Sequence, residues 1–350
     1  MHKHGDSAMT VKWSPSSPST LYSAALDGSI ACLDLRSGGA VSATTAPPVP
    51  AGEVAHLTEA AELAARSSKM ITPPITALGV GCGGSMLAVG SGTQVRFYDV
   101  RKLSASAEWP LLGGYTESHS ECITNLLFHP HLTSTLLSAD EAGLINVYNT
   151  AVSGEADALS GSITADGGVS SLGVFGPQGS CVYATTQSVS LQLWNLGSGE
   201  SMTHHPNLSL TFMQAGLDCS FLIDCTYDAA SQALSLWAGS HSGALHAFDV
   251  QHAGLRHMQA MTGGHTDDVR CLARAQPAGA GAPLFVSGAE DGSLATWSAA
   301  PPPQAATEAT ALPLMGLAQA AAGGKSSRSR KQGRKHSHKH SKTRSAGAPY

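Results

Sequence analysis

The chain has 350 residues, a formal net charge of −5 and 42% hydrophobic residues, with 38 glycines and 18 prolines. This composition favours one large domain of short strands joined by many turns. Seven scattered cysteines without a CxxC spacing argue against a disulfide framework and a zinc site, and the lack of a signal region or a long apolar run predicts a soluble intracellular protein without a membrane span.

Six segments along the chain share one pattern: an apolar run, a turn, a second run ending in small residues, a tight turn and an alternating run. Two-residue alternation is the strand period, and Asp-Gly between two such runs predicts a hairpin. One small sheet of this kind cannot bury both faces alone, so neighbouring sheets must stack. The segments lie near residues 4–36, 70–103, 115–150, 165–198, 215–250 and 263–298, and they close on Leu33-Asp34, Tyr98-Asp99, Tyr148-Asn149, Trp194-Asn195, Phe248-Asp249 and Trp297-Ser298.

The closing pairs and the spacing of these segments resemble WD repeats, which form the blades of β-propellers. The resemblance covers most of residues 4–300 and is strongest in 115–160 and 263–298. It implies an all-β propeller over residues 1–300 with six recognisable blades. Because many WD proteins close with seven blades, we expect an incomplete seven-bladed ring, or a last blade without its outer strand, from a sequence that starts late.

Residues 53–68, EVAHLTEAAELAARSS, are the one segment with a helical pattern, because Val54, Leu57, Ala61 and Ala64 recur at helical spacing. They lie in the connection 37–69 between the first and second blades, where we expect an inserted loop or helix. A partner-binding insertion, a helix packed on the propeller rim and a mobile loop are all compatible with this segment.

A serine, a histidine and an aspartate come together around the last segment, VSGAEDGSLATW, and they have two interpretations. A hydrolase would use them as a nucleophilic triad. The resemblance to WD repeats instead implies a structural hydrogen-bond network of His265, Ser287, Asp291 and Trp297, in which an imidazole, a hydroxyl and an indole N–H satisfy a turn carboxylate.

Recurrence of the pattern favours the structural interpretation, because a catalytic triad is needed only once. The first segment carries a partial copy, His4, Ser23 and Asp27, with Leu33 in place of the tryptophan. In the third segment, Ala142 occupies the aspartate position, so we expect a broken network there. A hydrolase would also need a G-x-S-x-G elbow, which is absent. We therefore expect no catalytic residue, cofactor, metal or small-molecule substrate.

Two further motifs have ordinary interpretations. GVGCGG at 79–84 matches GxGxxG, but a strand-like run follows it where a dinucleotide site needs a helix, so we expect a glycine-rich hairpin. HSHKHSK at 336–342 could hold a transition metal, but its cationic surroundings repel divalent ions, so incidental affinity is expected.

Residues 301–350 form a Pro/Ala linker and a basic tail that cannot bury enough apolar surface to fold. Residues 1–324 keep 11 of the 20 cationic side chains against all 25 acidic ones, a balance of −14. Such a tail is typical of a nuclear or nucleolar address, of a contact with RNA phosphates, or of a merely solubilising segment. Its cations are Lys325, Arg328, Arg330, Lys331, Arg334, Lys335, Lys339, Lys342 and Arg344.

Together these patterns predict a non-catalytic scaffold that binds other proteins in the nucleus or nucleolus, with the cytoplasm as the alternative location. The acidic body is expected to steer basic partners toward it. The alternative is an RNA-protein or ribosome-assembly factor whose tail contacts RNA. A third hypothesis is a serine hydrolase that uses His265, Ser287 and Asp291.

Overall fold

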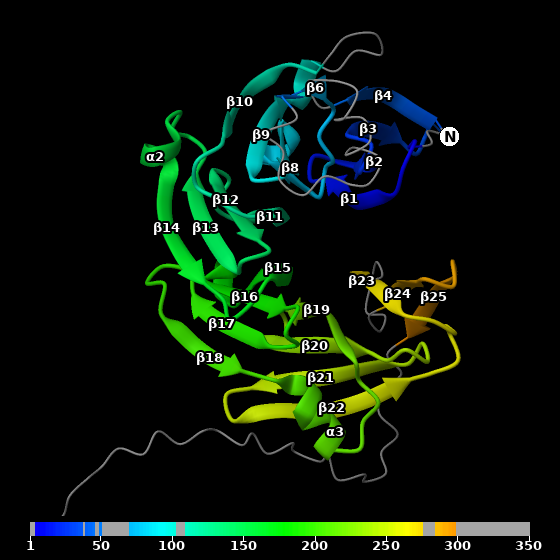
Figure 1. The fold of residues 1–350 in the computed structure, drawn as a ribbon. Coiled ribbons are helices and arrows are strands. Elements are labelled where there is room, and N and C mark those ends of the chain that lie inside the picture. The colour runs from blue at the N-terminus through cyan, green and yellow to red at the C-terminus, as the bar shows by residue number, and fades with distance from the viewer. Residues whose placement is uncertain are drawn as a thin grey trace, which may run out of the picture. The chain divides into compact units, whose positions relative to one another are not determined.

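A computed structural model describes residues 4–37, 39–45, 49–50, 70–102, 109–275 and 284–298. The chain divides into two units, Met1–Leu314 and Met315–Tyr350, and every described residue belongs to the first. Its described residues form five four-stranded antiparallel sheets and one three-stranded sheet, which follow one another in chain order as propeller blades, and one two-stranded ribbon (Figure 1). The all-β fold with six blades is therefore confirmed. The segment with a helical pattern at 53–68 and the tail at 301–350 lie outside the described residues.

The strand order within each blade follows the sequence. The first three blades contain β1 (Ala8–Ser14), β2 (Ser17–Ala25), β3 (Ser29–Asp34) and β4 (Gly39–Thr45); β7 (Ala77–Gly81), β8 (Met86–Ser91), β9 (Gln94–Asp99) and β10 (Leu111–Tyr115); and β11 (Ile123–Phe128), β12 (Thr135–Asp140), β13 (Leu144–Asn149) and β14 (Leu159–Thr164).

The last three blades contain β15 (Val169–Phe175), β16 (Cys181–Thr186), β17 (Leu191–Asn195) and β18 (Ser201–His205); β19 (Phe221–Asp228), β20 (Ala233–Gly239), β21 (Leu245–Gln251) and β22 (Gly254–Met261); and β23 (Val269–Ala275), β24 (Leu284–Ala289) and β25 (Leu294–Ser298). A two-stranded ribbon, β5 (Val49–Pro50) and β6 (Met70–Ile71), lies between the first two blades in the sequence. Two short helices, α2 (Glu155–Ala158) and α3 (Leu208–Gln214), lie in connections between strands.

The first strand of each blade is the innermost one. β1, β7, β11, β15, β19 and β23 contact one another in that order, so the blades radiate from a common centre. Each inner strand pairs with a neighbour on one side only, which leaves its other edge toward that centre. Loops before the inner strands are therefore repeated side by side around the unit.

The core lies between the blades rather than inside them. Tyr22 and Ile30 of the first blade pack with Leu78 and Leu87 of the second, and all four are less than 5% exposed. Fully burying a Leu or Ile side chain stabilises a fold by about 2 kcal/mol relative to leaving it exposed. The same type of cluster recurs at each of the four later junctions between consecutive blades.

The outer strands lie beyond the blade limits expected from the sequence. β4 falls in the connection 37–69 that was expected to be an inserted loop or helix, and β10, β14, β18 and β22 follow the ends assigned to their blades. Each outer strand with described side chains has several exposed residues, as in Leu111–Tyr115, so it lacks the apolar run that marks a buried strand. The hairpin expected at GVGCGG is confirmed: β7 and β8 flank a short 3-10 turn there.

No helix among the described residues is long and apolar enough to cross a bilayer.

His205, the last residue of β18, is buried without a partner. Its side chain is fully shielded from solvent, and neither ring nitrogen has a hydrogen-bond partner within the described part of the chain. Burial, with a smaller contribution from neighbouring His204, lowers the pKa of His205 to about 4. An unfolded chain takes up this proton near pH 6.5. Stability linked to His205 is therefore complete above that pH and is lost as the pH falls toward 4.

Replacing His205 with leucine should flatten the pH dependence of stability. Between pH 7 and pH 4 the wild-type chain should lose on the order of 3 kcal/mol more unfolding free energy than His205→Leu, as follows from the depressed pKa. Urea unfolding at both pH values measures the difference. His252→Leu, at an exposed turn position, is the matched control and should keep the wild-type slope; identical slopes in all three chains would contradict the prediction.

Candidate functional site

The sixth blade contains the expected histidine, serine and tryptophan in one hydrogen-bonded chain. His265, in the loop before β23, is 4% exposed. Its Nε2 lies 2.6 Å from the hydroxyl of Ser287, and its Nδ1 lies 2.8 Å from the hydroxyl of Ser293. The indole N–H of Trp297 donates to the Ser287 hydroxyl over 2.7 Å. His265 thus bridges two serines that flank the turn between β24 and β25.

Asp291 holds the loop and the turn together but does not orient the imidazole. Its carboxylate accepts hydrogen bonds from the backbone N–H groups of Thr266 and Ser293, both over 2.8 Å. The Ser293 hydroxyl and these two N–H groups hold the pKa of Asp291 well below its usual range. The distance of 3.8 Å between Asp291 Oδ1 and His265 Nδ1 is too long for a hydrogen bond. A hydrolase triad needs that bond.

The Ser287 hydroxyl is also unsuited to nucleophilic attack. Ser287 is 1% exposed, and its oxygen is engaged by both His265 and Trp297. A nucleophile must approach a substrate carbon within about 3–3.5 Å. The blade itself fills that space.

The first blade repeats this arrangement without the tryptophan. His4 lies 2.7 Å from the hydroxyl of Ser23 and 2.5 Å from that of Ser29, while Asp27 accepts the backbone N–H groups of Gly5 and Ser29. The serine two residues after the turn aspartate, at 29 and 293, was missed from the sequence. The sequence feature that could have indicated it is the tripeptide Asp-Gly-Ser, which both turns share at 27–29 and 291–293.

The third blade keeps a network, so the expectation of a broken one is wrong. His119 Nδ1 lies 2.8 Å from Asp140 Oδ2, and His119 Nε2 lies 2.6 Å from the Ser138 hydroxyl. The other Asp140 oxygen accepts the backbone N–H groups of Ala142 and Leu144. The carboxylate has moved two residues upstream, from the turn to the end of β12, and there it replaces both the turn aspartate and the second serine.

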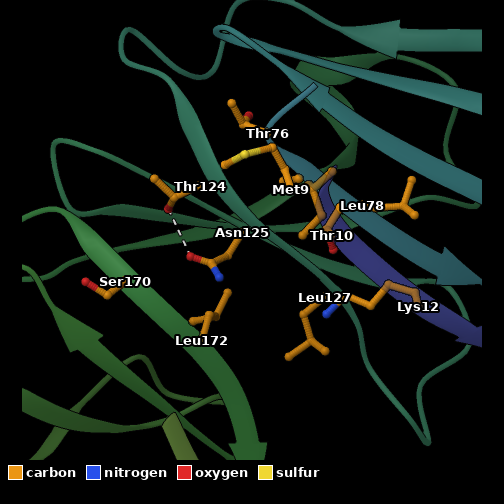
Figure 2. A pocket seen from close by; sticks show the side chains of 12 residues that line it. Met9, Thr10, Lys12, Thr76, Leu78, Thr124, Asn125, Leu127, Ser170 and Leu172 are labelled. Atoms are coloured by element: carbon orange, nitrogen blue, oxygen red, sulfur yellow. Dashed lines mark hydrogen bonds between the residues drawn. The ribbon is translucent and has the colours of Figure 1, made fainter. Parts of the chain in front are cut away.

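The inner strands β1, β7, β11 and β15 enclose a polar pocket of about 250 Å³ (Figure 2). Among the described residues, those that line it offer hydroxyl and amide groups and one ammonium group, and no carboxylate. Some of these groups are already engaged: the Thr124 hydroxyl donates to the Asn125 side chain over 2.9 Å, and Thr76 donates to a backbone carbonyl. The polar lining residues are Thr10, Lys12, Thr76, Thr124, Asn125 and Ser170.

One end of the blades is rich in carboxylates. Antiparallel strands alternate in direction, so the loops before the inner strands and the turns between second and third strands share one end, and backbone hydrogen bonds such as Glu141 N–H to Cys122 O join them. Arg270 pairs there with Asp268 and Glu290 at 3.0 and 2.6 Å. We call this the acidic end; its carboxylates are Asp6, Asp27, Glu117, Glu121, Glu141, Asp166, Asp218, Asp267, Asp268, Glu290 and Asp291.

At the opposite end, four aspartates pair with arginines. Asp34 and Arg36 lie 2.7 Å apart, and hydrogen bonds from Arg36 lower the pKa of Asp34 to about 2. The same combination recurs as Asp99–Arg101 (2.7 Å), Asp249–Arg256 (3.0 Å) and Asp228–Arg274 (3.1 Å). The negative potential of the described unit is therefore concentrated at the acidic end.

Within the described ranges, no three His, Cys, Asp or Glu side chains are grouped to hold a metal ion. The histidine-rich run 336–342 and the nine tail cations lie outside these ranges.

Comparison with known proteins identifies the repeat. Residues 257–298 match the family model described as WD domain, G-beta repeat. The chain is 28% identical over 189 residues to the WD repeat-containing protein 89 homolog of Dictyostelium discoideum, which covers 53% of this chain and 51% of that protein. It is 26% identical over 228 residues to WD repeat-containing protein GTS1 of Arabidopsis thaliana, and this match covers 62% of this chain and 56% of that protein. The resemblance to WD repeats is thereby confirmed, and the chain spans about half the length of these curated relatives.

Among solved structures, a chain in the crystal structure of the mitotic checkpoint complex superposes with a TM-score of 0.59, over 83% of this chain and 76% of that one. The two sequences are 15% identical, so this likeness shows the fold alone.

Removing Asp140 should destabilise the third blade strongly. In Asp140→Ala, His119 Nδ1 and two turn N–H groups lose their acceptor in a buried site, which should cost about 3 kcal/mol of unfolding free energy. Chemical denaturation measures it. Glu141→Ala, at the next and exposed position, is the control and should cost less than about 0.5 kcal/mol. Equal losses would contradict a structural role for Asp140.

Removing the Ser287 hydroxyl should lower the stability of the fold and should not abolish any hydrolase activity. Ser287→Ala leaves the Trp297 N–H and His265 Nε2 without their partner, which should cost about 1–3 kcal/mol. Thermal and urea unfolding measure the loss, with the exposed Ser231→Ala as control. An esterase activity of the wild-type chain that Ser287→Ala abolishes while stability is unchanged would overturn this assignment.

Proposed function

Because this chain carries a WD repeat within a six-bladed propeller, we propose that it is a non-catalytic scaffold that docks other proteins, and that basic segments of those proteins bind the acidic end. The observation that carries the proposal is the unequal charge of the two ends of the blades. At one end, four aspartates pair with arginines. The acidic end has eleven carboxylates, and Glu117, Glu141 and Asp267 among them are exposed and lack a cationic partner within the described residues. Loops on a rigid scaffold are also where binding residues concentrate.

The histidine, serine and aspartate side chains support a non-catalytic role. Their hydrogen-bonding groups are used within the blades, and comparable sets occur in the first, third and sixth blades. What remains for other molecules is the exposed charge of the loops. Such charge accelerates and orients the encounter with a partner of opposite sign, and it weakens as salt is added.

The basic tail supports a nuclear or nucleolar location as a further part of the proposal. After Glu308 the sequence has no acidic residue, and nine Lys and Arg follow within 325–344. Clusters of this length are typical of nuclear addresses. The same composition supports the alternative function, an RNA-protein or ribosome-assembly factor whose tail binds RNA phosphates.

Neutralising the acidic end should weaken binding of a cationic probe. The variant Glu117→Gln, Glu141→Gln, Asp267→Asn should bind a 20-residue polylysine peptide about tenfold more weakly at 50 mM salt, because each of the three charges contributes up to about 0.5 kcal/mol. Fluorescence polarisation measures the affinity. The control variant Glu200→Gln, Asp228→Asn, Asp249→Asn removes the same charge at the opposite end and should change affinity less than twofold. An equal loss of polylysine affinity in both variants would contradict the proposal that basic segments bind the acidic end.

Deleting residues 325–350 should redistribute a fluorescent fusion from the nucleus to the whole cell. Transfer of 325–350 alone to a reporter protein should direct that reporter to the nucleus. The RNA alternative predicts a different result: unchanged localisation, with retention of the full chain on immobilised RNA that falls with salt and disappears on deletion.

A further inference from the structure

The polar pocket between the first four blades differs in charge from the chain around it. The described residues that line it belong to β1, β7, β11 and β15 or lie directly before one of them, and Lys12 is the ionisable one among them. Residues 1–324 carry a balance of −14, so a lone cation without a lining carboxylate is a local reversal of charge. A reversal of this kind inside a concave site favours an anionic ligand.

The Lys12 ammonium group has no hydrogen bond or ion pair with another described residue. The carboxylate that acts on it electrostatically is Asp224 of β19, which does not line the pocket. The Tyr183 hydroxyl and the Cys225 N–H already donate to that carboxylate, over 3.0 and 2.7 Å. Lys12 extends from β1 toward Leu127 of β11 (Figure 2). Its charge therefore remains available to an anion in the pocket.

Three further groups can donate hydrogen bonds into the same pocket. The side-chain oxygen of Asn125 accepts the Thr124 hydroxyl over 2.9 Å, which orients the amide and leaves its NH₂ group without a partner among the described residues. The hydroxyls of Thr10 and Ser170 are likewise not engaged by any described group. Thr76, in contrast, donates to a backbone carbonyl over 2.6 Å.

The chemistry of these groups fits a phosphate group better than a carboxylate. A phosphate monoester carries about −1.5 to −2 charges at pH 7 and three strong acceptor oxygens. A carboxylate offers two oxygens and a single charge, and so would leave more of the four donors unused. The volume of about 250 Å³ is slightly below the range of roughly 300–1,000 Å³ for ligand pockets, so the ligand must be small.

We propose that the pocket enclosed by β1, β7, β11 and β15 binds the phosphate group of a ligand no larger than a sugar phosphate. Lys12 pairs with the phosphate, and Asn125, Thr10 and Ser170 donate hydrogen bonds to its oxygens. The pocket contains none of the carboxylates of the acidic end, so the proposal does not depend on the proposed function, and phosphate and polylysine binding are separately measurable. No sequence motif indicated this site, because its lining residues are spread over 9–172.

Isothermal titration calorimetry of the full chain with two probes tests the site, at pH 7.5 and constant ionic strength. Glucose 6-phosphate and inorganic phosphate are titrated separately, and the probe that binds more tightly identifies whether the phosphate comes from an ester or from the free ion. We expect saturable binding of one ligand per chain, and no binding of glucose. Lys12→Met should weaken binding about tenfold or more, because it removes the charge-assisted hydrogen bonds, whereas Lys12→Arg should keep most of the affinity.

Asn125→Asp tests the pocket with almost no change of shape. The variant keeps the oxygen that accepts the Thr124 hydroxyl but replaces the NH₂ group with a second carboxylate oxygen, so repulsion should abolish measurable phosphate binding. The melting temperature without ligand shows whether each variant is folded, and Lys12→Met, at an exposed position, should keep the wild-type value.

The basic tail supplies the control for binding by charge alone. Lys325→Met removes one of its nine cations and should leave the affinity for both probes within about twofold of wild type. An equal loss in Lys325→Met and Lys12→Met would mean that phosphate binds basic residues generally, and would overturn the proposal. It is overturned as well if neither probe saturates the full chain, or if Lys12→Met and Asn125→Asp bind as wild type.

Discussion

The structure depends on one constraint: a blade is a single sheet with two apolar faces, and only other blades can cover them. The strand β20 shows this directly. Its neighbouring residues Leu236 and Trp237 point to opposite faces and belong to different clusters, one shared with the fourth blade and one with the sixth. A strand buried on both faces is a continuous apolar run, which is why the inner parts of the blades are rich in Leu, Val and Ala rather than alternating.

The crossover from one blade to the next creates a second requirement, because it brings a histidine into a buried or partly buried place where its ring nitrogens need partners. The three networks meet that requirement with different residues. The acceptor near the histidine Nδ1 is a serine hydroxyl at Ser29 and Ser293, but it is the carboxylate of Asp140 in the third blade. What is repeated is therefore an acceptor close to the histidine and to one turn N–H, that of Ser29, Leu144 or Ser293, and the sequence position of the carboxylate differs by two residues.

This distinction explains how far the sequence could predict the molecule. The first three strands of most blades, their hairpins and their closing pairs were predictable, since burial on both faces and tight turns leave strong patterns. The outer strands were not, because a strand such as Leu111–Tyr115 is largely exposed and carries little apolar pattern. Asp140 was missed because the repeat pattern places the aspartate two residues later, in the turn, whereas Asp140 is the last residue of the strand β12. The acidic end was missed because it combines loops that are far apart in the sequence.

The acidic end follows from the repetition of the blades. Every blade contributes a crossover loop and a turn to one end, so the loops of all the blades combine there into one surface, as Glu117, Glu141 and Asp267 do. At the other end the aspartates fall at the ends of strands, where an arginine two residues on or on the next strand can reach them, as Arg36 and Arg256 do. The charge and the apolar contacts of a blade therefore lie on different parts of it: the loops carry the exposed carboxylates, and the sheet faces carry the contacts with neighbouring blades.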